Sequence, residues 1–587
     1  MTATPPAPPL VLGPLLRYIG ETEASVWVQT AAAATVTVER AGRSWSSGTF
    51  AVQGHHYALV VLDGLEPGSD EPYAVRLGPV PVWPPAGSDL PPPRIRTLDR
   101  SRPTTFAFGS CRTAAPHDDA GTRQHGVDAL RAFALALAEG RVGWPDLVAF
   151  LGDQVYADDT PEEMQEFIAA RRSLEQPPGE EIRDFVEYAE LYRLAWEDPT
   201  NRWLLSTLPS AMIFDDHDIR DDWNTSWSWH EEINRTSWWQ ERLQGGLVAY
   251  WVYQHIGNLS PARLAEDPVW RLLPADADGG PAPVDGDPAP EPDLTEVLFD
   301  LARRADLHPD AYRWSYARDL GDCRLVVVDS RAGRVLTPDS RSMLDEDEMA
   351  WLDARVTGGV QHLFLGTSLP FLLPPGVHDL EAVSEVVARG DWGRRLGAGA
   401  EKLRQLVDLE HWAAFEDGFL RVLDMVMETA RGERGPAPAT ITFLSGDVHH
   451  SYVAELVDAE GSGARSRVVQ AVCSPIRNPM SPRLRAAVSL LSRRVAGTAV
   501  RRLARWSAKV PDPAYPWALT HGPWYDNNLA VVAVEGPRLR MTWYAGTLGD
   551  EGPERPGLAE VYTLTVDGRE PSPEAPREAA AGDAFVG

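Results

Sequence analysis

Side chains that can bind metals follow directly after an apolar segment in the first third of the chain. Residues 147–159 read LVAFLGDQVYADD, so Asp153, Tyr156 and Asp158 come straight after a short apolar run. Such a run is typical of a buried strand. In open α/β sheets, ligands bind beyond the carboxyl ends of the strands. The segment therefore predicts a metal site where a buried strand ends.

Three other strand-like segments end in a similar polar cluster. The clusters read GSCR at 109–112, FDDHDIRDDWN at 214–224 and GDVHHS at 446–451. Each is a weak signal alone, because a single Asp after a strand is more often a helix N-cap and a single Cys is more often a small buried apolar residue. Together they indicate that several strands bring carboxylate, imidazole, thiolate and phenolate groups to one sheet edge. Burial of so many polar groups requires compensation, which a bound metal would supply.

The charge balance restricts the class of partner. The chain has 587 residues, 43% of them hydrophobic, with 55 basic against 85 acidic side chains and a net charge of −30. This disfavours a nucleic-acid duplex but allows a small phosphate ester, because bound cations can reverse the local field.

Three cysteines cannot form a disulfide framework, and the N-terminus lacks the basic region or twin arginine of an export signal. We expect a cytoplasmic protein without stable membrane insertion, and the sequence leaves its oligomeric state open.

The residue pattern changes near position 100 and predicts two domains. Residues 10–98 form short alternating segments, and the unit LDGLEPGSDEPYAVRL at 62–77 resembles the end of an immunoglobulin-like or fibronectin-III-like β-sandwich. Residues 103–567 alternate apolar strand-like runs with longer helix-like segments, which is typical of a sheet covered on both faces. The strands after residue 466 look antiparallel. The expected fold is therefore α/β, a sandwich of two sheets behind an N-terminal β-sandwich.

Several segments are expected to lie outside this core. Residues 1–9 are predicted to be flexible, 273–293 to form a surface loop and 568–587 to be disordered, because their compositions are biased. Residues 481–509 form a basic amphipathic pattern in an acidic protein. We expect this basic segment to contact the chain's own acidic surface, with membrane lipid or an anionic substrate as alternatives.

The order of the four polar clusters resembles that of the metallophosphatase superfamily. The particular set GSC, GDQVY, DDHD and GDVH, preceded by a β-sandwich, resembles the PhoD-like alkaline phosphatase and phosphodiesterase family. The resemblance spans residues 10–565 and implies a metallophosphatase-type αββα sandwich. It also implies metal ligands at Cys111, Asp153, Tyr156, Asp216, Asp447 and His449.

The family is known for an iron(III) and calcium site, so the resemblance implies Fe(3+) and Ca(2+), with Asp153 bridging two metals. The residue types agree, because thiolate, phenolate and carboxylate are electron-donating anions that favour trivalent iron over zinc. Further carboxylates could complete an oxygen-rich calcium shell, and the sequence does not decide among Asp158, Asp159, Asp215 and Asp221. A dinuclear Zn(2+) or Mn(2+) site on the same fold is the alternative.

Two residues are candidates for contact with the substrate. His217 matches the superfamily histidine near the substrate, which implies a leaving-group acid or a phosphate contact; a structural histidine bonded to carboxylates is the alternative. Arg112 could hold phosphate oxygens with two hydrogen bonds, or form a salt bridge with a nearby acid. The expected reaction is hydrolysis of a phosphate monoester or diester by in-line attack of a metal-activated water or hydroxide. A catalytically degenerate binding protein on this fold is the competing hypothesis.

Overall fold

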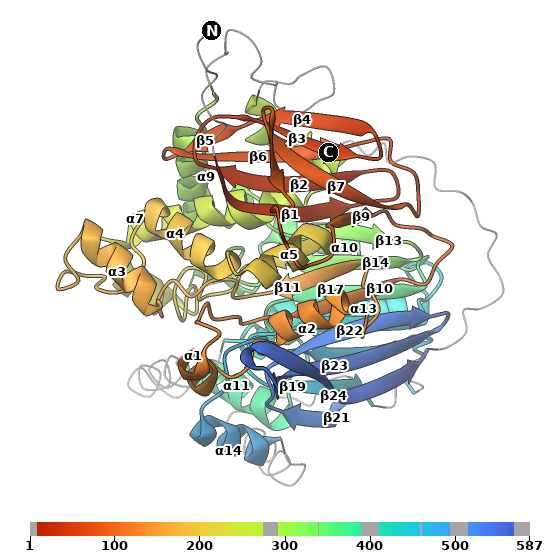
Figure 1. The fold of residues 1–587 in the computed structure, drawn as a ribbon. Helices are drawn as coiled ribbons and strands as arrows, with labels where there is room; N and C mark the ends of the chain where they lie inside the picture. The colour runs from red at the N-terminus through yellow and green to blue at the C-terminus, as the bar shows by residue number, and fades with distance from the viewer. Residues whose placement is uncertain are drawn as a thin grey trace, which may run out of the picture.

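The computed structural model describes residues 9–273, 291–337, 340–388, 410–457, 461–492 and 515–568 (Figure 1). The segments predicted to be flexible at 1–9, looped at 273–293 and disordered at 568–587 lie almost wholly outside these ranges. The basic segment at 481–509 is described only as far as residue 492. No helix within the described ranges is both long and apolar enough to cross a membrane.

The N-terminal region consists of two antiparallel sheets. Their strand orders are β1-β2-β6-β5 and β4-β3-β7-β8, and β9 pairs with β7. In β3, Val36 and Val38 are buried and the residues between them are more exposed, as expected of a strand with one face on a core. An N-terminal β-rich region is therefore confirmed, and its finer assignment as immunoglobulin-like or fibronectin-III-like stays a prediction. The strands are β1 (Leu10–Ile19), β2 (Ala24–Thr30), β3 (Thr35–Arg40), β4 (Arg43–Gly48), β5 (Phe50–Val52), β6 (His55–Leu62), β7 (Asp70–Leu77), β8 (Val80–Trp83) and β9 (Arg94–Arg96).

Two larger sheets follow, one in the order β12-β11-β10-β22-β23-β24 and one in the order β13-β14-β17-β18-β20-β19-β21. Their strands are β10 (Thr105–Gly109), β11 (Leu147–Leu151), β12 (Ser210–Ile213), β13 (Tyr316–Leu320), β14 (Cys323–Val328), β17 (His362–Thr367), β18 (Thr440–Ser445), β19 (Ser451–Leu456), β20 (Arg467–Val472), β21 (Trp517–Trp524), β22 (Asn528–Glu535), β23 (Arg538–Gly549) and β24 (Gly552–Asp567). A separate hairpin joins β15 (Val335–Thr337) and β16 (Ser340–Ser342).

The prediction of an antiparallel C-terminal part is correct for β22, β23 and β24 and holds on only one side of β20. β20 pairs parallel with β18 and antiparallel with β19. The reason lies in the chain path. After β18 the chain places β19 one position further out, so β20 returns between them in the direction of β18.

The two sheets pack face to face. The rings of Phe106 in β10 and Phe364 in β17 meet edge to face with centroids 4.9 Å apart, and the indole of Trp543 in β23 donates a hydrogen bond to the carbonyl of Val472 in β20. Alternate residues of β17 point the other way, because Leu363 and Leu365 belong to a second hydrophobic cluster with residues of α10 and α13. The arrangement is therefore helix, sheet, sheet, helix.

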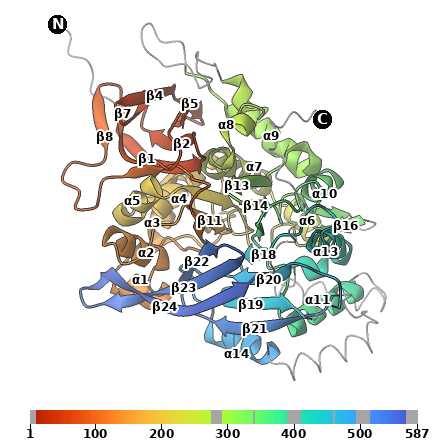
Figure 2. The same cartoon turned by 90° about the vertical axis from the view of Figure 1, so that its right-hand side faces the viewer.

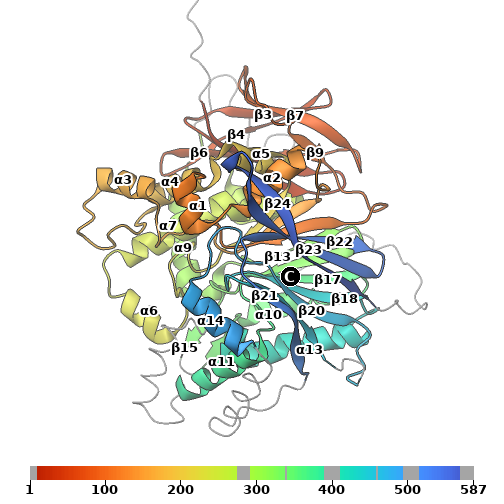
Figure 3. The same cartoon turned by 60° about the horizontal axis from the view of Figure 1, so that its bottom comes forward.

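Helices cover the outer faces of the paired sheets, with α2 on one side and α10 and α13 on the other (Figure 2). α14 lies beside β21 at one end (Figure 3). The α-helices are α1 (Asp119–His125), α2 (Ala129–Ala138), α3 (Glu162–Arg171), α4 (Phe185–Trp196), α5 (Pro199–Thr207), α6 (Trp227–Ile233), α7 (Trp239–Ala249), α8 (Pro261–Leu264), α9 (Thr295–Leu307), α10 (Glu346–Asp353), α11 (Pro375–Ala388), α13 (Glu416–Arg431) and α14 (Pro482–Leu491). The last turns of α7 continue as the π-helix η1 (Tyr250–His255).

A buried arginine fixes the N-terminal β-rich region to the α/β region. Arg17 of β1 is fully buried, and its guanidinium donates to the carbonyl oxygens of Tyr253 and Gln254 at 2.5 and 2.7 Å and to Asn258 Oδ1 at 3.2 Å. Gly257 makes room for it, since a Cβ at that position would lie 2.7 Å from the Arg17 side chain. The two regions therefore share one continuous core.

Replacement of Arg17 by Met should destabilise the protein by about 3 kcal/mol or more, because the buried carbonyls of Tyr253 and Gln254 would lose their charged donor. Arg43→Met in β4 is the control. Arg43 is half exposed and pairs with Asp63, so its loss should cost no more than about 1 kcal/mol. Urea denaturation followed by tryptophan fluorescence measures both, and equal midpoints for the two variants would contradict this role.

Candidate metal centre

The four polar clusters meet at the carboxyl ends of their strands. β10, β11 and β12 run parallel in one sheet, and β18 ends beside them in the other. Backbone and hydroxyl bonds join the loops that follow: the amide of Cys111 donates to the carbonyl of Gly152, and the amide of Asp447 donates to Ser110 Oγ. Convergence of the clusters, predicted from the sequence, is thus present in the structure.

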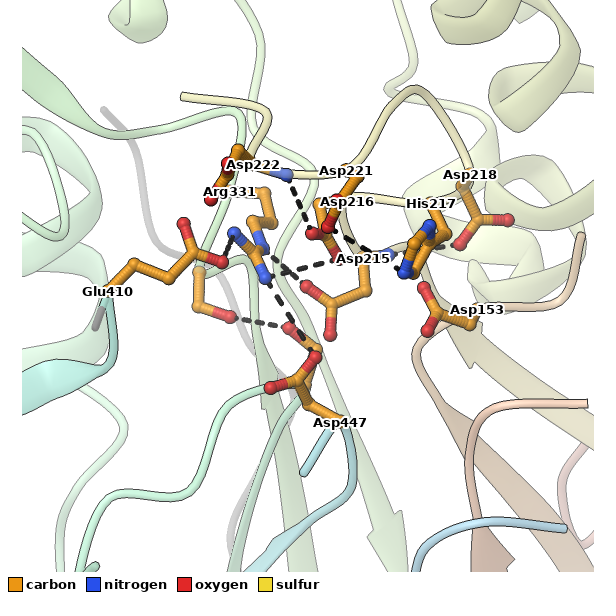
Figure 4. Close-up of polar contacts among 12 residues, drawn as sticks. Asp153, Asp215, Asp216, His217, Asp218, Asp221, Asp222, Arg331, Glu410 and Asp447 are labelled. Carbon is orange, nitrogen blue, oxygen red and sulfur yellow. Dashed lines mark hydrogen bonds and ion pairs between the residues drawn. The ribbon is translucent and has the colours of Figure 1, made fainter. Parts of the chain in front are cut away.

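Potential ligand atoms form three overlapping groups, and within each group the atoms lie no more than 4.8 Å apart. The groups are Cys111, Asp153 and His449; Asp153, Asp216 and His217; and Asp215, Asp216 and Asp447. Asp153 belongs to the first two groups and Asp216 to the last two. The ligand groups therefore form one continuous row, most of which is visible in Figure 4.

Several of these residues adopt a backbone conformation that side chains disfavour. Cys111, Asp153, Asp447 and His449 have φ angles of 58°, 43°, 63° and 50°, in the left-handed region that normally suits glycine. Such residues cost about 1–3 kcal/mol each and persist where the surrounding structure fixes them. The strain is concentrated at the ligand groups, where it aims the side chains at one another.

The donor set fits a metal ion. Asp153 Oδ1 and Asp215 Oδ2 are buried and accept no hydrogen bond. Burial raises the pKa of both carboxyls, and it raises the pKa of Asp216 to about 6. The phenol of Tyr156 lies beside them, with its hydroxyl 3.3 Å from Asp153 Oδ2. Oxygen, sulfur and imidazole donors gathered in a largely buried site suit a multivalent cation.

A fifth strand end, after β20, contributes residues that the sequence analysis missed. Ser474 Oγ donates to Cys111 Sγ at 3.3 Å and accepts from the amide of His449 at 3.2 Å. Asn478 forms a side-chain hydrogen bond with Tyr156 that lowers the phenol's pKa, although burial dominates and the pKa is raised overall. The polar segment SPIRN directly after an apolar run was the available signal.

His217 combines features of both predicted roles. Its Nδ1 contacts Asp158 Oδ1 at 2.9 Å, which is the predicted structural contact with a carboxylate. Its Nε2 lies 3.9 Å from Asp221, and the side chain is 24% exposed. Burial lowers the pKa of His217, but Asp158 and Asp216 outweigh it and hold that pKa well above its ordinary value. Nε2 is therefore the ring nitrogen that Asp158 does not bind.

Arg112 makes the predicted salt bridge. Its Nε and Nη2 both donate to Asp128 Oδ2, at 3.1 and 2.8 Å, and Nη1 donates to the carbonyl of Ala195 at 2.8 Å. The pair is buried, and His117 and Asn201 contact the same carboxylate. The phosphate contact, the other role considered for Arg112, stays a prediction.

The four acids considered for the calcium shell lie in different surroundings. Asp215 belongs to a ligand group, whereas Asp158 accepts from His217 and from the amide of Asp221. Asp159 and Asp221 are exposed. Asp218, the last acid of the third cluster, is buried and accepts from the Asp215 amide and from Gln254, so it fixes the loop.

A buried arginine that the sequence analysis did not single out lies among the ligand groups. Arg331, in the loop after β14, pairs through Nε with Asp215 and through Nη1 with Glu410. Its Nη2 lies 3.2 Å from Asp216 and 3.9 Å from Asp447 (Figure 4). On the other side of Asp447, His411 Nε2 approaches Oδ2 at 3.3 Å. The ligand groups are thus bordered by the guanidinium of Arg331 and the imidazole of His411.

The chain is similar to known proteins in part of its sequence and in its fold. Residues 115–274 match the family model of PhoD-like phosphatases, and residues 7–95 match a domain of unknown function, DUF7800. The solved structure of PhoD superposes with a TM-score of 0.58 at 14% identity, covering 97% of this chain and 92% of PhoD. A purple acid phosphatase from yellow lupin seeds matches with a TM-score of 0.48 at 8% identity, covering 96% and 75% of the two chains.

A search of curated proteins finds no significant match. The family model covers the second and third polar clusters, and the superposition on PhoD extends the same fold over both sheets. These findings support a metallophosphatase-like α/β fold with an N-terminal β-rich region, and they imply a phosphatase with a metal cofactor. The family-model match over residues 115–274 and the structural match to PhoD together support a PhoD-like family member.

Proposed function

We propose that this protein hydrolyses small phosphate esters, monoesters or diesters, with metal ions held by the row of ligand groups. The observation that carries the proposal is the sharing of Asp153 and Asp216 between neighbouring groups. A carboxylate with two oxygens can bridge two cations, and paired cations are the usual arrangement for displacement at phosphorus. The family match supports the same reaction class.

The ligand types divide the row into two parts. Cys111, Tyr156 and His449 would hold iron(III) together with Asp153, since sulfur and phenolate donors lie only at that end. Asp216 and Asp447 would hold calcium at the end where only carboxylates are present. When bound, such ions would neutralise charge on the phosphoryl group and lower the pKa of a water molecule. Zinc or manganese at both positions is the alternative.

The chain's own residues supply the remaining steps. Asp158 holds His217 through Nδ1, so Nε2 can carry the proton that the leaving oxygen takes up, or can contact a phosphate oxygen. A phosphate contact by Arg112 would require its guanidinium to leave Asp128. We therefore propose that Arg112 acts mainly by fixing the loop that carries Cys111.

Replacement of Asp153 by Asn, or of Cys111 by Ser, should remove nearly all esterase activity while the protein stays folded. The loss should exceed the roughly 10- to 100-fold effect of residues that only support a ligand. Asp300→Asn, an exposed acid on α9, is the control and should keep full activity. The measurement is turnover of p-nitrophenyl phosphate and bis-p-nitrophenyl phosphate, with circular dichroism to check the fold. Full activity in either site variant would refute the assignment.

The role of His217 can be tested by comparing hydrolysis rates for substrates with different leaving groups. If Nε2 protonates the leaving oxygen, His217→Asn should slow hydrolysis of an alkyl phosphate by about 10²- to 10⁴-fold. It should slow p-nitrophenyl phosphate far less, because that leaving group departs without a proton. Equal losses on both substrates would instead assign His217 a structural or phosphate-binding role.

Metal content and colour separate the remaining alternatives. An iron(III)–tyrosinate bond absorbs visible light, so the purified enzyme should be coloured, and Tyr156→Phe should remove the colour. Elemental analysis should find iron and calcium, and a chelator should abolish turnover. A colourless, fully active enzyme would favour zinc or manganese. Protein without bound metal and without turnover of either ester would favour the degenerate binding protein.

A further inference from the structure

Arg331 contacts more acidic groups than any ordinary ion pair requires. All three of its guanidinium nitrogens face carboxylates: Nε faces Asp215, Nη1 faces Glu410, and Nη2 lies between Asp216 and Asp447. These acids come from three separate segments, the loop after β12, the segment before α13 and the loop after β18. One planar cation with several fixed donors therefore joins three parts of the site.

The location of Arg331 excludes direct contact with substrate. Its side chain is 1% exposed and is enclosed by its acidic partners. A guanidinium keeps its proton throughout the ordinary pH range. The positive charge is therefore permanent, and it lies beside the ligand group that consists only of carboxylates.

We propose that Arg331 is the resident counter-cation of this centre, which holds Asp215, Asp216 and Asp447 in place in the metal-free protein and competes with a bound metal for the same carboxylates. The inference rests on the proposed function, because it assigns these aspartates to the metal site. The guanidinium of Arg331 then holds the loops of the centre together, so the fold does not depend on a bound metal to do so.

The neighbouring Arg334 provides a matched control. It is equally buried and shares Glu410 with Arg331, through Nη1 at 3.1 Å. Nη1 also donates to the backbone carbonyl of Asn224, Nε donates to that of Ser330, and Nη2 donates to that of Glu410. Arg334 thus has the same size, charge and burial, but none of its hydrogen bonds or ion pairs within the described residues reaches an aspartate of the ligand groups.

The experiment compares Arg331→Met with Arg334→Met in the full-length protein. Each metal-stripped protein is melted with and without added calcium chloride, and calcium affinity is measured by isothermal titration. Arg331→Met should lower the melting temperature of the metal-free protein more than Arg334→Met does. Added calcium should raise the melting temperature of Arg331→Met by more than that of Arg334→Met. Calcium should also bind Arg331→Met at least tenfold more tightly than the wild type, because a fixed repelling charge is gone.

Arg331→Lys keeps the charge but offers a compact ammonium in place of the planar fork, so it should melt between the wild type and Arg331→Met. This variant also keeps the test decisive if Arg331→Met does not fold. Equal calcium-dependent shifts in Arg331→Met and Arg334→Met, or calcium affinity unchanged from the wild type, would overturn the inference. An esterase assay on the wild type keeps the two proposals separate: turnover with unchanged calcium binding in the variants refutes only the role of Arg331.

Discussion

Burial of many carboxylates in one small volume is the constraint on which this structure depends. Asp153, Asp215 and Asp216 are buried at the junction of two sheets, and the side chain of Asp447 beside them is 11% exposed. Uncompensated carboxylates there would make the fold unfavourable, since desolvation of charge costs several kcal/mol per ion. Compensation comes from Arg331 on one side and from His411 beside Asp447 on the other. Bound cations would supply the rest, which links metal binding to the stability of the centre.

The fold around this centre holds its parts rigidly. Loops from both sheets are joined by hydrogen bonds, and the strained backbone at Cys111 and Asp447 shows that their conformations are imposed by the surroundings. The N-terminal β-rich region contributes at a distance. Through Arg17 it fixes the turn after α7, and Gln254 in that turn bonds Asp218 of the third cluster. The β-rich region therefore supports a loop of the centre without supplying any of the residues in its ligand groups.

Much of this arrangement could be predicted from the sequence. Apolar runs that end in Asp, Cys or His located the loops of the centre, because strand ends in a covered sheet lie at one edge. The position of β20 could not be predicted, since strand order depends on the path of the chain and not on local pattern. Arg331, Glu410 and His411 were missed for a similar reason. Each is unremarkable among its neighbours in sequence, and only long-range packing brings it to the aspartates.

The central claim is that a row of shared ligands binds at least two cations. A crystal structure of active protein, with anomalous difference maps collected at the absorption edges of the metals found by elemental analysis, tests it most directly. The account predicts one peak among Cys111, Asp153 and His449 and a second beside Asp216 and Asp447. Crystals of active enzyme that show no metal peak at these positions would contradict it.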